Sequence, residues 1–275
     1  MPRCLCLLGA VLAVLCVAPV AVSAVEKAST AGAVRTNEPV GGGLTVGFGE
    51  LQEDWRGEII QLSWSPRSFL IKGFLSDEEC DHLINKAKPM MKKSSVVNPK
   101  TGASMDSDVR TSTGSWFPMG DDDVITRIES RVAQVSMIPK ENQEGLQILH
   151  YQDGEKYDPH FDYFHDKANQ EDDKGGQRVA TMLIYLTTVE EGGETVFPSA
   201  DKKVTGDGWS DCAKRGLAVK AIRGDALLFY GLKPDGTTDP SSLHGSCPTT
   251  KGEKWSATKW IHVGPRGRHE PSNFH

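Results

Sequence analysis

The sequence predicts a mainly β fold with flanking α-helices: a double-stranded β-helix, or jelly roll, supported by N-terminal helices. Three observations lead to this prediction. After residue 145, short runs rich in β-branched and aromatic residues recur, and turns rich in Gly, Asp, Pro and Lys separate them. Two amphipathic helical patterns precede these runs. The length of 275 residues suffices for one large domain of this class.

The N-terminal residues predict a targeting segment. Arg3 precedes a nearly continuous apolar stretch from Cys4 to Val22, and small residues end it. We interpret residues 1–24 as a signal peptide. The alternative is an uncleaved anchor, because the stretch reaches the length of a bilayer span. Both place the rest of the chain in the secretory pathway, in the lumen of the endoplasmic reticulum or Golgi, and only the anchor would attach it to a membrane.

The remaining chain divides into three parts. Residues 25–52 are rich in Gly, Ala, Thr and Val without periodicity, which is typical of a flexible linker. Residues 53–264 form the predicted folded domain, and residues 265–275 form a polar tail.

Two helices are predicted at the start of the domain. Residues 76–79 form a capping-box pattern, after which apolar residues recur at helical spacing until Pro89. A second helix begins after three aspartates at 121–123, and Pro139 closes it. The polar segment 94–120 between the helices is a candidate lid, with a mobile surface loop as the alternative.

The predicted strands begin with a strand-like stretch from Ile59 to Trp64, and the others follow Gly145. Apolar and aromatic residues concentrate in each run, and turn-forming residues bound it. The later runs are Leu146–Tyr151, 179–189, 217–222, Ala226–Tyr230 and 255–263. No internal repeat is visible, so this spacing favours an antiparallel jelly roll.

Charge and cysteine content limit the partners and the compartment. The formal net charge is −6, and the basic residues are dispersed, so no nucleic-acid partner is expected. Outside the leader the cysteines are Cys80, Cys212 and Cys247. Cys80 lies on the apolar side of the first helix and is predicted to be a buried free thiol. Cys212 and Cys247 lie in polar loop sequence of a secreted chain, and we predict a disulfide between them.

Three residues suggest a metal site. His160 and Asp162 are two positions apart, which on a strand puts both side chains on one face. His244 lies far downstream in a turn-rich loop, and a jelly roll can return it to the same barrel mouth. Two imidazoles and one carboxylate form the facial triad of non-haem iron(II) oxygenases. From these residues alone, a catalytic zinc hydrolase remains an alternative.

Lys254 suggests a co-substrate. It opens a predicted strand, 254–263, where a lysine is most often a solvated residue at the edge. If the strand lines the barrel, alternation points Lys254, Ser256, Thr258 and Trp260 to the same face. A buried ammonium group needs a partner. The distal carboxylate of 2-oxoglutarate would supply it while the keto-acid end chelates iron.

The chain from about Trp55 to Val263 resembles the plant and algal prolyl 4-hydroxylases, within the iron- and 2-oxoglutarate-dependent dioxygenase superfamily. Seven segments carry this resemblance: LSWSPRSFL (62–70), RTSTGSWF (110–117), LHYQDGEKYDPHFDYFHD (149–166), GGQRVATMLIYLTTVEEGGETVFP (175–198), GDGWSDCAKRGLAVK (206–220), GDALLFY (224–230) and SLHGSCPTTKGEKWSATKWIHV (242–263). They cover nearly all of the predicted domain.

The resemblance implies a role for each site residue. The Fe(II) ligands would be His160, Asp162 and His244. The 5-carboxylate of 2-oxoglutarate would be bound by Lys254, with help from Tyr151 and Thr195. The residues that match the proline site are Tyr157, Trp260 and Arg178; the alternatives are core packing for the aromatic residues and a surface ion pair for the arginine.

The resemblance also implies the reaction and the partners. Residues 53–264 would be an Fe(II)/2-oxoglutarate dioxygenase domain that hydroxylates C4 of peptidyl proline, with ascorbate restoring iron(II). The substrate would be a proline-rich, polyproline II polypeptide, such as a cell-wall glycoprotein, over which segments 94–120 and 167–176 could close. The enzyme is expected to be monomeric. The alternatives are a 2-oxoglutarate oxygenase acting on another residue or proline context, a jelly-roll binding module without catalysis, and a non-catalytic partner in an enzyme complex.

Overall fold

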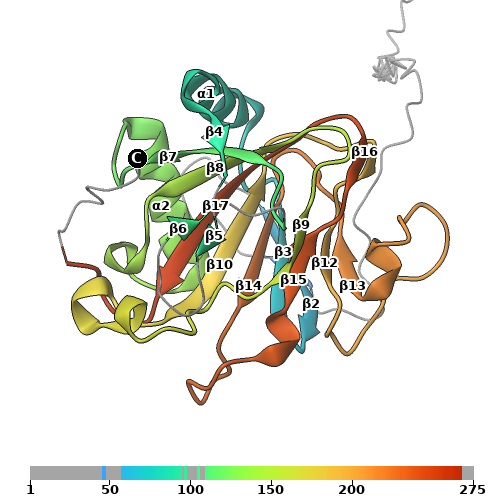
Figure 1. Ribbon diagram of the computed structural model, residues 1–275. Helices are drawn as coiled ribbons and strands as arrows, with labels where there is room; N and C mark the ends of the chain where they lie inside the picture. Colours follow the sequence, from blue (N-terminus) through green and yellow to red (C-terminus); the bar gives the residue numbers. More distant parts are fainter. Residues whose placement is uncertain (1–44, 48–56, 95, 98–103, 106–108, 268–275) are drawn as a thin grey trace, which may run out of the picture. The chain divides into compact units, whose positions relative to one another are not determined.

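The structure is a computed structural model that describes residues 45–47, 57–94, 96–97, 104–105 and 109–267. Two β-sheets face each other, and two helices cover the outer side of the larger sheet (Figure 1). The predicted leader 1–24 and most of the predicted tail lie outside the described residues. None of the helices within the described ranges has the length and apolar character that a membrane crossing requires.

The larger sheet has nine strands among the described residues, and neighbouring strands are antiparallel. In spatial order they are β1 (Thr45–Gly47), β2 (Glu58–Trp64), β3 (Arg67–Lys72), β14 (Ala226–Tyr230), β10 (Arg178–Tyr185), β17 (Lys254–His262), β8 (Leu146–Tyr151), β7 (Thr113–Phe117) and β4 (Lys92–Lys93).

The smaller sheet has four strands in the described part of the chain. In spatial order they are β13 (Leu217–Val219), β12 (Thr195–Phe197), β15 (His244–Ser246) and β9 (Tyr157–His160). Two short pairs complete the strands: β11 (Glu191–Gly192) with β16 (Thr249–Lys251), and β5 (Val96–Val97) with β6 (Ser104–Met105). Short 3₁₀ turns lie at Lys88–Met90, Lys140–Asn142, Ala168–Gln170, Asp172–Lys174, Ala213–Arg215 and Pro240–Ser242.

Eight of these strands form the predicted jelly roll. In chain order, β8, β10, β14 and β17 lie in the larger sheet, and β9, β12, β13 and β15 lie in the smaller one. The chain therefore passes back and forth between the sheets, as in a double-stranded β-helix. This winding makes β9 and β15 neighbours although more than eighty residues separate them in sequence. It thereby brings the predicted metal ligands to one place.

Both predicted helices form, α1 at Asp77–Ala87 and α2 at Asp123–Ser136. The capping box is present, since the Ser76 hydroxyl accepts from the Glu79 N–H and the Glu79 carboxylate accepts from the Ser76 N–H. A buried ion pair joins the helices, with 2.9 Å between Arg131 Nη1 and Glu79 Oε2. Their apolar sides belong to the same hydrophobic cluster as the outer face of the larger sheet.

Strand alternation divides the core into two layers. On β10, Ala180, Met182 and Ile184 face the helices, whereas Tyr185 faces the smaller sheet. Because the larger sheet is covered on both sides, its central strands are buried almost throughout. The pocket described below lies between the two sheets, on the side away from the helices.

The structure differs from the sequence predictions in four segments. Thr45–Gly47 pairs with β2 inside the segment that we expected to be a linker. Thr113–Phe117, expected in a lid, is strand β7 between β8 and β4. Its polar composition hid this, because neighbouring strands supply the hydrogen bonds. The predicted strand 179–189 ends at Tyr185, and 217–222 ends at Val219.

Candidate active site

His160, Asp162 and His244 converge. Their ligand atoms lie within 4.8 Å of one another. Asp162 Oδ1 is 3.6 Å from His160 Nε2, and Asp162 Oδ2 is 3.5 Å from His244 Nε2. The two histidines are directly paired across β9 and β15. The three side chains therefore form the predicted cluster of two imidazoles and one carboxylate.

Two details of that prediction were wrong. We expected His160 and Asp162 on one strand, but β9 ends at His160 and Asp162 lies in the bend that follows. We expected His244 in a loop, but it begins strand β15. Pairing with His160 extends the backbone at His244, and the bend after β9, rather than alternation along a strand, turns the Asp162 carboxylate toward both imidazoles.

Hydrogen bonds orient all three ligands. The Nδ1 of His160 lies 2.9 Å from the Asp158 carbonyl, and the Nδ1 of His244 lies 3.0 Å from the Ser242 carbonyl. Since a carbonyl only accepts, each Nδ1 carries the hydrogen and each Nε2 lone pair faces the centre. Thr181 donates to Asp162 Oδ2 at 2.7 Å. Such partners fix the orientation of metal ligands.

The protonation states suit a metal ion. Burial, followed by the neighbouring His244, lowers the pKa of His160 to about 3. Burial would raise the pKa of Asp162, but the adjacent imidazoles of His244 and His160 outweigh it, and the pKa is lowered. At neutral pH His160 is therefore neutral and Asp162 is charged, which are the forms that bind metals. The donor set fits Fe(II).

This cluster lies in a pocket between the two sheets. Lys254, Ser256, Thr258 and Trp260 all line it, so the predicted alternation along β17 is confirmed. Lys254 lies opposite Tyr151 in the register of β17 and β8. The pocket is thus bounded by the metal cluster on the smaller sheet and by these β17 and β8 side chains on the larger sheet.

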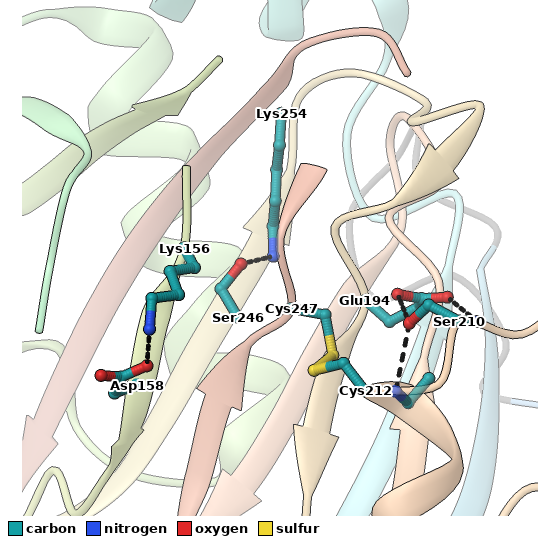
Figure 2. The surroundings of a disulfide bond; sticks show 9 residues. Lys156, Asp158, Glu194, Ser210, Cys212, Ser246, Cys247 and Lys254 are labelled. Atoms are coloured by element: carbon teal, nitrogen blue, oxygen red, sulfur yellow. Dashed lines mark hydrogen bonds and ion pairs between the residues drawn. A yellow bond between two sulfur atoms is a disulfide. The ribbon is translucent and has the colours of Figure 1, made fainter. Parts of the chain in front are cut away.

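Lys254 is a buried cation for which the described residues provide no carboxylate partner. Its exposed fraction is 1%, and its Nζ donates to Ser246 Oγ at 2.8 Å (Figure 2). Burial lowers the pKa of Lys254 to about 7, although Glu194 opposes the shift. Within the ranges that the structure describes, no carboxylate oxygen lies within 4 Å of Nζ. Because a buried ammonium requires a counter-charge, the pocket fits a ligand carboxylate here, and the solvated-edge alternative is wrong.

Tyr151 and Thr195, which we expected beside Lys254, lie in the same pocket. Both are buried and line the pocket with Lys254. Thr195 Oγ1 accepts from the Tyr185 hydroxyl at 2.9 Å, so its own hydrogen is available to a ligand. Burial raises the pKa of Tyr151, which remains a neutral donor. The Nζ of Lys254 lies 5.5 Å from the Tyr151 ring.

Of the three residues predicted for the proline site, two line the pocket and one does not. Tyr157 and Trp260 line the pocket, and Tyr157 stacks on His160 with ring centroids 3.6 Å apart. Burial raises the pKa of Tyr157 to about 12. Trp260 Nε1 is buried without a hydrogen-bond partner in the described structure. Arg178 does not line the pocket; its guanidinium lies 3.9 Å from the Trp260 ring.

Arg178 forms a part-buried ion pair, not a solvent-exposed one. Its Nε donates to Glu144 Oε1 at 2.6 Å, and its Nη2 donates to Glu144 Oε2 at 3.0 Å. Burial would raise the pKa of Glu144, but Arg178 and His262 hold that pKa far below its usual range. Arg178 therefore packs against the Trp260 ring from outside the pocket.

Sequence reasoning missed four polar residues of the pocket or its wall. Arg110 and Gln147 line the pocket, and Arg110 Nη2 donates to Gln147 Oε1 at 3.2 Å. The others are Thr181 and Ser246. Thr181 alternates with Leu183 on β10, which would have identified it. Ser246 follows His244 by two positions, but strand β15 was not predicted.

The cysteines behave as predicted. Cys212 and Cys247 form a disulfide with 5.8 Å between their Cα atoms, beside Ser246 (Figure 2). Cys80 is a buried free thiol on α1, and burial raises its pKa to about 11. The disulfide ties the loop before β13 to the end of β15, the strand that carries His244.

Comparison with known proteins gives the family context. The profile of the 2OG-Fe(II) oxygenase superfamily matches residues 146–262, from β8 through β17. Probable prolyl 4-hydroxylase 6 of Arabidopsis thaliana is 57% identical over 214 residues, which are 76% of this chain and 74% of that protein. Probable prolyl 4-hydroxylase 7 of the same plant is 56% identical over 208 residues. That match covers 74% of this chain but 65% of the relative, slightly less than two thirds.

Solved structures support the fold. The viral collagen prolyl hydroxylase of Paramecium Bursaria Chlorella virus-1, in its 2OG complex, is 29% identical, with a TM-score of 0.52. The alignment covers 70% of this chain and 94% of that one. A truncated form of the same viral enzyme gives a TM-score of 0.50 at 27% identity, covering 70% of this chain and 88% of that one.

Proposed function

We propose that this chain, which belongs to the prolyl 4-hydroxylases of the 2OG-Fe(II) oxygenase superfamily, hydroxylates C4 of prolyl residues in proline-rich polypeptides. One observation carries the proposal: a single pocket contains a three-residue metal cluster and a buried ammonium that lacks a carboxylate among the described residues. A metal cluster alone would also fit a zinc hydrolase or a binding module. The combination fits an iron oxygenase with a keto diacid co-substrate.

The residues divide the work between metal and co-substrate. His160, Asp162 and His244 would hold Fe(II), and three protein ligands leave further coordination positions for the reactants. Bound Fe(II), with O₂ and 2-oxoglutarate, supplies the oxidation that inserts oxygen into a C–H bond while 2-oxoglutarate yields succinate and CO₂. Lys254 neutralises the distal carboxylate, and Tyr151 and Thr195 donate hydroxyl hydrogens toward it.

The substrate side of the pocket is aromatic. Tyr157 lies against His160, and Trp260 presents an indole N–H that has no acceptor in the described structure. Such a surface suits a polyproline II chain, which loses little conformational entropy on binding and offers regularly spaced carbonyls. We propose that Trp260 donates to a substrate carbonyl and that Arg178 fixes its ring. Hydroxyproline-rich cell-wall glycoproteins are the proposed natural class.

Peptide-dependent turnover tests the proposal. Purified protein is incubated with Fe(II), 2-oxoglutarate, ascorbate and one of three peptides: proline-rich, collagen-like, or lysine-containing without proline. We expect succinate to accumulate with the proline-rich peptide, and mass spectrometry to locate one added oxygen on proline. Asp162→Ala, which removes one metal ligand, is the inactive control. Oxidation on lysine would support the alternative substrate class, and no peptide-dependent succinate would support a binding module.

The compartment and the assembly are part of the proposal. A disulfide so close to the site favours an oxidising lumen, in agreement with the predicted leader. We propose a monomeric enzyme of the endoplasmic reticulum or Golgi that uses ascorbate to restore iron(II). Protease protection in sealed microsomes tests the location, and light scattering tests the monomer. Cleavage without detergent would contradict the lumenal location, and a dimeric mass would contradict the monomer.

A further inference from the structure

The C-terminal segment 263–267 follows β17 and lies along the loop 171–177, which leads into β10 (Figure 1). Three of its backbone N–H groups donate to carbonyls of that loop: Val263 to Gln177 at 3.0 Å, Gly264 to Gly175 at 2.9 Å and Gly267 to Asp173 at 3.2 Å. A fourth, that of Arg266, donates to the Glu141 carbonyl at 2.9 Å. The segment is therefore fixed between the loop before β10 and the turn before β8.

The contact between this segment and the loop is close-packed. Gly175 has a φ of +90°, a conformation that favours glycine. A Cβ at this position would lie 2.9 Å from the Gly264 carbonyl oxygen and 2.8 Å from Arg266 Cγ. The loop thus approaches the segment more closely than a residue with a side chain would allow, and the base of the Arg266 side chain is held in place.

Arg266 reaches the carboxylate that holds Arg178. Its Nη1 lies 3.6 Å from Glu144 Oε2, the oxygen that accepts from Arg178 Nη2 at 3.0 Å. The other oxygen, Oε1, lies 2.8 Å from His262 Nε2. Among these three partners of Glu144, Arg266 is the most exposed, at 31% of its side chain. Arg266 therefore covers the side of the Glu144–Arg178 pair that faces solvent.

Arg178 carries the effect of this carboxylate into the active site. Its guanidinium lies 3.9 Å from the Trp260 ring, and its Nη1 donates to the Asp162 carbonyl at 3.4 Å. An ion pair is stronger and better defined where water is excluded from it. If water reached Glu144, both hydrogen bonds from Arg178 would loosen, and the Trp260 ring would lose a rigid support.

We propose that Arg266 is a positioning residue for the peptide substrate: by shielding the Glu144–Arg178 pair, it keeps the Trp260 ring in one orientation. The inference rests on the proposed function, in which the Trp260 indole N–H donates to a substrate carbonyl. Arg266 itself does not line the pocket. The metal site depends on it much less, because the Asp162 carboxylate is oriented from within the pocket.

Arg266→Ala tests the inference by calorimetry. Fe(II)-loaded protein, kept anaerobic and saturated with 2-oxoglutarate, is titrated with a proline-rich peptide. We expect the Kd for the peptide to rise about fivefold, as the loss of a partly exposed ion pair predicts. The Kd values for Fe(II) and for 2-oxoglutarate should change less than twofold. In turnover assays KM for the peptide should rise, with kcat at saturation nearly unchanged.

Three further variants give the controls. Arg266→Lys keeps the positive charge and should restore most of the peptide affinity. Arg215→Ala removes an exposed arginine from the turn Ala213–Arg215 and should leave every Kd unchanged. Glu144→Gln removes the charge that Arg266 pairs with. Because Arg266 acts through Glu144, adding Arg266→Ala to Glu144→Gln should raise the peptide Kd less than twofold.

Four outcomes decide the inference. Equal peptide affinity in Arg266→Ala and the parent would overturn it and leave the proposed function intact. A fivefold loss that persists in the Glu144→Gln background would also overturn it, because Arg266 would then act by another route. An equal loss of affinity for Fe(II), 2-oxoglutarate and the peptide would overturn it in favour of a merely structural role. If the parent itself does not bind the peptide, the proposed function and this inference both fail.

Discussion

Binding of 2-oxoglutarate should weaken as the pH rises above about 7, because Lys254 must be protonated to receive it. Burial lowers the pKa of Lys254 from 10.5 to about 7 in the unliganded protein. A bound carboxylate stabilises the ammonium form and moves this pKa back toward its ordinary value. Below pH 7 the lysine is charged in both states and affinity is constant. Above pH 7 binding must take up a proton.

The magnitude follows from this difference. Each pH unit above 7 reduces the affinity about tenfold while the pKa of the complex lies higher, which is roughly 1.4 kcal/mol per unit. Between pH 7, where the lysine is half deprotonated, and pH 9 the Kd should therefore rise by about 50-fold. Calorimetry at pH 8 in two buffers with different ionisation enthalpies should report the uptake of about one proton per 2-oxoglutarate bound.

Lys254→Arg is the matched control. A guanidinium remains charged across this range, so the variant should show a Kd that does not depend on pH, even if its affinity at pH 7 is lower. The reasoning is refuted if the parent binds equally well from pH 6.5 to pH 9. It is also refuted if the arginine variant shows the same slope, since another group would then take up the proton.

Three other changes test the remaining parts of the site. Lys254→Met should abolish 2-oxoglutarate binding yet raise the free energy of unfolding of the unliganded protein by about 1 kcal/mol or more, because it removes a buried charge that no described carboxylate pairs. In urea unfolding the gain should be larger at pH 6, where the lysine is charged, than at pH 8. A variant less stable than the parent would contradict this. Cys212→Ala should raise the Kd for Fe(II) about tenfold in anaerobic titration, because the end of β15 is released; unchanged iron binding would make the bridge merely structural. Gly245→Ala places a Cβ 2.8 Å from the Tyr157 carbonyl oxygen and should separate β15 from β9, so that metal binding weakens at least tenfold. In the control Gly231→Ala the new Cβ meets nothing closer than 3.5 Å, and metal binding should be unchanged.

The residues along β17 show what sequence reasoning could establish. A nine-residue strand is long enough for the alternation of its side chains to be recognised in the sequence, so Lys254 and Trp260 were correctly placed on one face. The His160–Asp162 pair was also found, although the proposed reason was wrong, because β9 ends before Asp162. In that case the residue types and their closeness in sequence identified the pair, whereas the assumption that both residues lie on one strand was incorrect.

Short elements and distant partners could not be predicted. Strand β15 has three residues, too few to show a period, and its extended shape depends on pairing with β9 and β12. Ser246 was missed for this reason. Arg178 was expected at the pocket or in a surface ion pair, but Glu144 holds it behind Trp260. Such a partner is set by the tertiary fold and is not visible in local sequence.

The site draws its side chains from both sheets, and this has an energetic consequence. The metal cluster belongs to β9, β15 and the bend after β9, whereas Lys254 and Tyr151 belong to the larger sheet. These two sets of residues come together only in the folded protein, so the free energy of binding metal and co-substrate adds to the stability of the packed sheets. Because no described carboxylate pairs with Lys254, its buried charge destabilises the same packing until a ligand carboxylate binds. A protein built this way is stabilised most by the diacid that bridges the sheets, so the groups that select the co-substrate also couple its binding to the fold.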